Sequence, residues 1–257
     1  NEAALIAARR DKTSVEMDDF NAAVDRIIGG LEKKNKIISK EEKQVIAYHE
    51  AGHAVSSWFL QYANPLVKVS IVPRGRSLGA AWYLPDERNI TNTEQLQDEM
   101  AAILAGRAAE EIVFGKISTG AQNDLDRVTK MAYSMVVVFG MSDKVGNVSY
   151  YDMLQQNTLT KPYSDSTAEA IDAEIRGIID AQYERVKKLL KKRRKELNTV
   201  AEELLQNEMI YRDRVVELIG ESPFVEKSEE DLIESKEDVT KPEQAEEQAQ
   251  PKDETTE

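Results

Sequence analysis

Cysteine is absent from this 257-residue chain, and histidine occurs only twice. The lack of cysteine excludes a disulfide framework, a cysteine-ligated zinc site, an iron–sulfur cluster and a thiol nucleophile. Long apolar runs are also missing: no stretch approaches the roughly 20 residues that a membrane-spanning helix needs, and the N-terminus lacks a signal-peptide pattern. We therefore expect the chain as given to be soluble. Hydrophobic residues still make up 41% of it, enough for a substantial core in one or two domains.

Basic residues are outnumbered, with 34 Lys and Arg against 47 Asp and Glu, a net charge of −13. Residues 226–257 alone hold 13 acidic and four basic side chains, which accounts for −9 of that charge. This segment has almost nothing apolar after Ile233, so it cannot bury enough surface to offset its ordering entropy. We interpret residues 225–257 as an acidic, disordered tail that aids solubility, and we expect no binding to nucleic acid.

The chain begins with a helical pattern over residues 1–10 that has no capping residue ahead of it, as if the sequence were part of something longer. A second helix is predicted from Glu16 to Ile28, where Gly29 and Gly30 end it. Residues 31–43 are rich in Lys and Glu and offer little to a core. We interpret them as a linker into the main domain.

The rest of the sequence predicts a mainly α fold with a small β-sheet. Helical spacing of apolar residues predicts four further helical regions: 44–61, 93–114, one that ends at Gly140, and a long region over 164–207 that bends. Residues 67–72 and 79–84, rich in β-branched and aromatic side chains, predict two strands joined by a basic turn. The basic run over 187–195 is most simply a solvated helix face, and the apolar stripe of that helix suits domain or subunit packing.

Both histidines fall in one motif, His49-Glu50-Ala51-Gly52-His53, on the helix predicted over 44–61. Residues at i and i+4 leave the same helix face about 5–6 Å apart, so both imidazoles can bind one zinc ion at about 2.0–2.1 Å. Glu50 lies beside them and can accept a proton from the attacking water and return it to the leaving amine. The motif therefore predicts a zinc-dependent hydrolase with Glu50 as its general base.

A plainer alternative is that two histidines four residues apart are ordinary, partly buried polar groups. The metal site is favoured because the only two histidines of the chain both lie in the motif. Gly52 also costs about 1 kcal/mol relative to alanine in a helix interior, a departure that often accompanies function. We interpret Ala51 and Gly52 as small residues that leave room for a substrate backbone.

A catalytic zinc ion usually has three protein ligands and one open position. Since no further histidine and no cysteine remain, the third ligand must be a carboxylate. Glu110 and Glu111, near the end of one predicted helix, are candidates. Asp124, near the start of the next, is another, although it could simply stabilise that helix N-terminus. The residue types alone do not decide among them.

Six short segments stand out in their order and spacing: NEAAL at 1–5, AYHEAGHA at 47–54, PRG at 73–75, LG at 78–79, GRAAEE at 106–111 and STGAQNDL at 118–125. Together they resemble the FtsH family of membrane-anchored, ATP-dependent AAA zinc metalloproteases, and the likeness runs from Asn1 to about Phe224. The resemblance implies that zinc is bound by His49, His53 and Asp124 and that Glu50 is catalytic. It also implies that Glu110 or Glu111 is a supporting carboxylate.

The resemblance further implies a domain organisation. Residues 1–30 would be the end of an AAA ATPase helical subdomain, and residues 44–224 a helical zinc metalloprotease domain. The chain has no G-x-x-x-x-G-K-[ST] phosphate loop, so ATP and Mg²⁺ would bind only in an ATPase module absent from it. The implied partners are unfolded or membrane polypeptides and further copies in a homo-hexamer. The implied location is an inner membrane, reached through a region absent from this chain, with the protease domain facing cytoplasm or matrix.

Substrate binding can be argued from the predicted strands, because an unfolded polypeptide can add itself to an exposed strand edge through main-chain hydrogen bonds. The resemblance favours the segment Gly79, Ala80, Ala81, Trp82 and Tyr83 for this role. Its alternative is an ordinary strand that packs on a helix. A different class of function, a zinc-stabilised binding or scaffold module, would show metal-dependent melting without cleavage.

Overall fold

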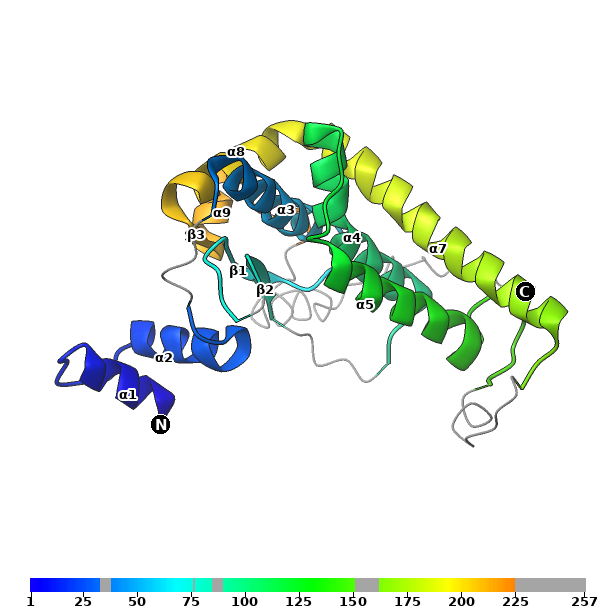
Figure 1. The fold of residues 1–257 in the computed structure, drawn as a ribbon, viewed down its shortest axis with the longest axis horizontal. Coiled ribbons are helices and arrows are strands. Elements are labelled where there is room, and N and C mark those ends of the chain that lie inside the picture. The colour runs from blue at the N-terminus through cyan, green and yellow to red at the C-terminus, as the bar shows by residue number, and fades with distance from the viewer. Residues whose placement is uncertain (33–37, 76, 85–89, 151–161, 225–257) are drawn as a thin grey trace, which may run out of the picture. The chain divides into compact units, whose positions relative to one another are not determined.

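Figure 1 shows the fold in a computed structural model, which describes residues 1–32, 38–75, 77–84, 90–150 and 162–224. The tail expected over 225–257 and part of the expected linker lie outside the described residues. Helices dominate the rest, and three short strands form one antiparallel sheet. The predicted mainly α fold with a small sheet is confirmed.

The helices are α1 (Glu2–Arg9), α2 (Met17–Val24), α3 (Lys40–Trp58), α4 (Thr93–Phe114), α5 (Gln122–Tyr133), α7 (Asp165–Lys192), α8 (Arg194–Asn207) and α9 (Arg212–Ile219). Two π-helical turns, η1 (Asp25–Gly29) and η2 (Ser134–Val138), continue α2 and α5. The strands are β1 (Leu66–Ser70), β2 (Ala80–Tyr83) and β3 (Met209–Tyr211), in the order β2-β1-β3. β2 is therefore an edge strand. Among the described helices, none is both long and apolar enough to cross a membrane.

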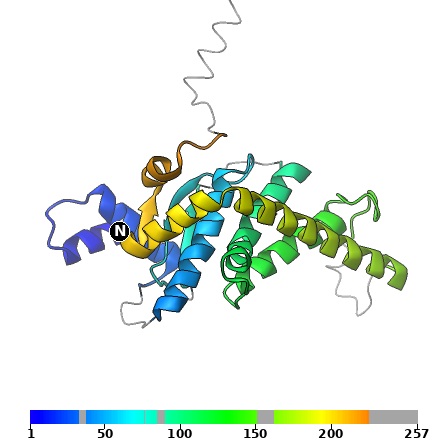
Figure 2. The ribbon, with the colours of Figure 1, turned by 90° about the horizontal axis from the view of Figure 1, so that it is seen from above.

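α3 is the central helix. It begins at Lys40, earlier than expected, because the Ser39 hydroxyl accepts a hydrogen bond from the backbone N–H of Glu42 and acidic residues fill the first turn. α4, α8 and β1 all pack on it, and α7 packs on α4. Figure 2 shows α7 and α8 as a long path across the other helices; the expected bend occurs at Arg193, which separates the two.

The contact between α3 and α4 is unusually close because small residues face each other. A Cβ atom placed on Gly52 would lie 2.6 Å from the backbone oxygen of Ala105 and 2.7 Å from the Cβ of Ala109. Ala51 is fully buried. The interpretation of Ala51 and Gly52 as room left free above the helix is therefore wrong: Gly52 is small so that α4 can approach.

The third strand, β3, was not predicted, since three residues show no usable periodicity. It pairs with β1 on the side opposite β2. In the central register, Lys68 of β1 faces Trp82 of β2 and Tyr211 of β3. The sheet thus holds β2 beside α3. One edge of β2 pairs with β1, and its other edge pairs with no described strand.

Substitution of Gly52 by alanine tests the close helix contact. Alanine has the higher helix propensity, yet its methyl group would overlap α4, so Gly52→Ala should lower the free energy of unfolding by about 1–3 kcal/mol. Gly177 on α7 is the matched control, because a Cβ there meets nothing within 4 Å. Gly177→Ala should raise stability by up to about 1 kcal/mol in the same urea titration of metal-free protein. Equal effects at both positions would contradict the packing argument.

Candidate metal centre

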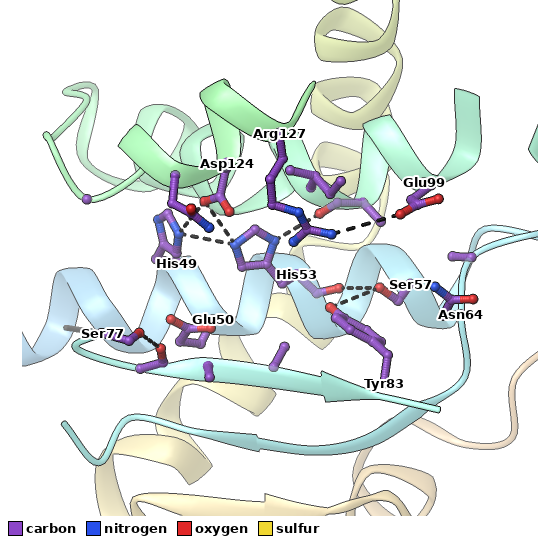
Figure 3. A pocket seen from close by; sticks show the side chains of 18 residues that line it. His49, Glu50, His53, Ser57, Asn64, Ser77, Tyr83, Glu99, Asp124 and Arg127 are labelled. Atoms are coloured by element: carbon purple, nitrogen blue, oxygen red, sulfur yellow. Dashed lines mark hydrogen bonds and ion pairs between the residues drawn. The ribbon is translucent and has the colours of Figure 1, made fainter. Parts of the chain in front are cut away.

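Two imidazoles from α3 meet a carboxylate from the first turn of α5 (Figure 3). His49 Nε2 lies 3.3 Å and His53 Nε2 lies 3.5 Å from Asp124 Oδ2, and the two Nε2 atoms are 3.1 Å apart. Tetrahedral ligands at about 2.0–2.1 Å from one zinc ion would be about 3.3–3.4 Å from each other. The three donor atoms therefore have the separations that a single tetrahedral divalent ion requires.

Each histidine is oriented through its other ring nitrogen. His49 Nδ1 donates to Glu110 Oε1 at 2.7 Å, and His53 Nδ1 donates to the backbone oxygen of Ala102 at 2.9 Å. Glu110 is held in turn by the backbone N–H of Ser118, 2.7 Å from Oε2. Such partners fix the tautomer and the ring direction of metal-binding histidines, and they turn both Nε2 atoms toward the same point.

The neighbouring carboxylate of Glu111 points elsewhere. It accepts hydrogen bonds from the Tyr183 hydroxyl at 2.5 Å and from Lys187 Nζ at 2.9 Å, both on α7. Successive residues on a helix differ in direction by about 100°, so Glu110 faces α3 while Glu111 faces α7. The alternatives that the residue types left open thus separate in space: Asp124 joins the two Nε2 atoms, Glu110 lies behind His49, and Glu111 lies outside the site. Lys187, expected on a solvated face, is engaged in this ion pair.

Gly106 is a site residue that the sequence reasoning missed. A Cβ atom there would lie 2.5 Å from His49 Nε2 and 2.6 Å from His53 Nε2. Any side chain on Gly106 would therefore occupy the space where the donors converge. The available signal was a glycine in the middle of an alanine-rich helix, where it costs about 1 kcal/mol in helix propensity.

Burial and charge oppose each other at the donors. Burial lowers the pKa of His49, but its hydrogen bonds to Asp124 and Glu110 outweigh burial and raise that pKa to about 10. Burial raises the pKa of Asp124, whereas hydrogen bonds from His49 and His53 bring it well below its usual value. Because metal ligands must be deprotonated, a cation at these donors would compete with protons for His49.

Glu50 is 7% exposed and lies beside the two histidines without joining the donor cluster (Figure 3). Burial raises the pKa of its carboxyl, opposed by the nearby His53 and His49. Gly79 packs directly on it: a Cβ there would lie 2.7 Å from Glu50 Oε1. A carboxylate with increased proton affinity is thus held where β2 meets α3.

A cleft of about 250 Å³ opens from the donors and runs between α3, α4, α5 and β2. Four of the five residues predicted to bind substrate line it: Gly79, Ala80, Ala81 and Tyr83. The fifth, Trp82, does not line it: its ring lies beside Lys68, its partner on β1, with the Lys68 Nζ 5.2 Å away. Ser57 and Tyr83 form the far end of the cleft, where their hydroxyl groups are 3.2 Å apart.

Comparison with known proteins gives matches over most of the chain. Residues 36–218 match peptidase family M41. The chain is 58% identical to the ATP-dependent zinc metalloprotease FtsH of Parabacteroides distasonis over 233 residues, which are 90% of this chain and 34% of that protein. It is 54% identical to the FtsH of Rhodothermus marinus over 228 residues, 87% of this chain and 33% of that protein.

A eukaryotic relative is the mouse mitochondrial inner membrane m-AAA protease component AFG3L1. It is 49% identical over 229 residues, which are 89% of this chain and 29% of that protein. The chain therefore spans about a third of the length of the curated relatives it matches.

Glu110 and Glu111 form a matched pair for testing the support of the donors. Glu110→Gln should weaken Zn²⁺ binding about 10–100-fold, because the amide is a poorer acceptor for His49 Nδ1. Glu111→Gln should leave Zn²⁺ affinity within about twofold while it removes an equal charge. Competition with a chromogenic chelator measures both affinities, and equal weakening by the two variants would show that charge alone matters.

Proposed function

Because the chain belongs to peptidase family M41, we propose that it is a zinc-dependent endopeptidase, the proteolytic part of an ATP-dependent AAA protease. The convergence of His49, His53 and Asp124 at separations suited to one tetrahedral ion is the observation that supports this most strongly. The cleft that opens from these donors supplies the space for a peptide.

In this proposal His49, His53 and Asp124 hold the zinc ion, and Glu110 orients His49. Their donor set of two neutral imidazoles and one carboxylate suits catalytic zinc, and Gly106 keeps the point of convergence clear. A bound zinc ion supplies a Lewis acid that makes water nucleophilic near neutral pH and polarises the scissile carbonyl.

Glu50 is the general base. Its carboxylate takes a proton from the attacking water and delivers it to the leaving amine, so the base of the first step is the acid of the second. Burial supports both roles, because it raises the pKa of Glu50 toward the pH at which a group exchanges protons efficiently.

The substrate binds along the edge of β2 that pairs with no other described strand. A peptide laid beside Ala80–Tyr83 would continue the order β2-β1-β3 as a fourth strand and pass along the cleft. Main-chain pairing reads the backbone rather than the side chains, so the substrates are unfolded polypeptides of many sequences. Gly79, Ala80 and Ala81 have little or no side chain, which leaves the cleft open to bulky substrate residues.

The wider setting is proposed from the family resemblance and the names of the relatives. ATP and Mg²⁺ would act in a separate ATPase module, of which residues 1–30 form the end, joined through residues 31–43 to a protease domain over 44–224. Assembly would be a homo-hexamer, and attachment to an inner membrane would run through a region other than this chain, with the protease domain facing cytoplasm or matrix. The mass of the assembled protein in solution, measured by light scattering, checks the hexamer.

Glu50→Gln should keep zinc but reduce hydrolysis of an unstructured, casein-type substrate by at least about 100-fold, because the amide cannot accept the proton. Asp124→Asn is the contrasting variant and should lower the zinc content itself. Elemental analysis and a fluorogenic assay, each with and without a chelator, separate the two effects. Unchanged turnover in Glu50→Gln would refute its role, and metal-dependent melting without cleavage in the parent chain would favour a scaffold module.

A backbone-modified peptide tests the edge strand. N-methylation of one amide near the scissile bond removes a hydrogen-bond donor and leaves every side chain unchanged. If strand addition positions the substrate, kcat/KM should drop at least about tenfold at alternate amides, which face β2, and much less at those between them. A loss that does not alternate along the peptide would contradict pairing with β2.

A further inference from the structure

Lys68 is a charged residue in an unusual place, the middle of the central strand. It is only 5% exposed, although β1 offers its other face to the helical core through Val69. Trp82 and Tyr211, its partners on the two neighbouring strands, flank it: the Lys68 Nζ lies 5.2 Å from the Trp82 ring and 5.8 Å from the Tyr211 ring. The ammonium is thus enclosed by two aromatic side chains on the face of the sheet turned away from the core.

Asp25, at the start of η1, supplies the counter-charge. It is 5% exposed and forms a close ion pair and hydrogen bond with Lys68 Nζ, while Arg74 lies 3.6 Å from its second oxygen. This pair joins residues 43 positions apart in the sequence. Loss of Asp25 would leave the buried Lys68 ammonium without this partner, and loss of Lys68 would leave Asp25 with the more distant Arg74. Either loss is more costly than loss of an exposed ion pair.

The segment that contains Asp25 also packs against β2 itself. A Cβ atom on Gly29 would lie 3.3 Å from the Trp82 ring and 3.2 Å from Arg74 Cδ. The backbone N–H of Gly75 donates a hydrogen bond to the backbone oxygen of Leu31, which follows this segment, at 3.2 Å. The end of η1 therefore packs on the Trp82 side of β2, and Trp82 does not line the cleft.

The other face of the same strand lines the cleft. Gly79, just before β2, contacts Glu50, and Ala80 and Ala81 follow along the substrate edge. Three contacts thus connect the N-terminal helical segment to the site: Asp25 with Lys68, Lys68 with Trp82 of β2, and Gly79, the residue just before β2, with Glu50. A displacement of β2 would move the edge that binds peptide, whereas the three metal donors lie on α3 and α5.

We propose that Lys68, held by Asp25, is a positioning residue for substrate: the buried pair fastens η1 to the sheet and sets the place of β2 beside Glu50. This inference rests on the proposed function, because it assigns the pair a role in binding the peptide at β2. It does not assign the pair a role in metal binding or proton transfer.

Steady-state kinetics on the 257-residue chain with an unstructured fluorogenic peptide test the proposal. Lys68→Met and Asp25→Asn should each raise KM about tenfold and change kcat by less than about twofold, because substrate positioning is lost while the donors and Glu50 remain. Zinc content should be unchanged. Lys68→Arg, which keeps the charge, should restore KM to within about threefold of the parent value. A fall in kcat at constant KM, or no change in either, would overturn the proposal.

The double variant Asp25→Asn with Lys68→Met guards against misfolding, because it removes both buried charges of the pair together, while Arg74, partly exposed, keeps Glu32 at 4.0 Å. If the two residues act as one unit, its KM should equal that of a single variant instead of the product of both effects. A return of KM to the parent value would show that the single variants merely suffered from a buried charge. Lys144→Met is the control: it removes a lysine from an ion pair with Glu174 of α7, and Lys144 is exposed. This variant should leave KM unchanged.

Tryptophan fluorescence provides a second readout, independent of activity. The chain has two tryptophans, and Trp58 is 3% exposed in the core, so changes at the sheet report on Trp82. Lys68→Met should increase acrylamide quenching of the more accessible tryptophan, and Lys144→Met should not. If the parent chain shows no zinc-dependent hydrolysis, the proposed function fails, and unchanged quenching in Lys68→Met would separately overturn the positioning role.

Discussion

The close approach of α4 to α3 is the constraint on which the site depends. Gly52 lets the backbone of α4 reach α3 near Ala105, and one residue later Gly106 leaves space in front of both Nε2 atoms. The same approach brings Glu110 within hydrogen-bond distance of His49 and the backbone oxygen of Ala102 within reach of His53. A wider spacing between α3 and α4 would leave both rings without their orienting partners. The geometry of the donors therefore depends on the close packing of these two helices.

Hydrogen bonds then distinguish the three carboxylates around the histidines, of which Glu50 and Glu110 are buried and Asp124 partly buried. Glu110 and Asp124 accept hydrogen bonds from the imidazoles, and the pKa of each lies below its usual value despite burial. Burial is the largest influence on all three, but at Glu50 it outweighs the nearby His53 and His49, so the pKa of Glu50 is raised. Similar side chains thus acquire opposite proton affinities from their surroundings: two suited to remain charged beside a cation, and one suited to exchange a proton.

The sequence predicted the elements well where periodicity was strong and failed where it was weak. α4 was expected over 93–114 and has those bounds, and the long C-terminal helical region bends as expected. β3 escaped notice because it is three residues long and owes its extended form to pairing with β1. Gly52 was misread because periodicity locates a helix but does not say which neighbour each face meets.

Local spacing by itself determined the pairing of His49 with His53 and the place of Glu50 beside them, since 3.6 residues per turn fix these directions within one helix. Only the tertiary structure decided the rest. Asp124 is 75 positions from His49 in the chain. Glu110 and Glu111 are adjacent, and only their different directions on α4 decide that Glu110 meets His49 and Glu111 meets Lys187. Which carboxylate meets the imidazoles depends on how whole helices pack, and that follows from the shapes of many small residues instead of from any one motif.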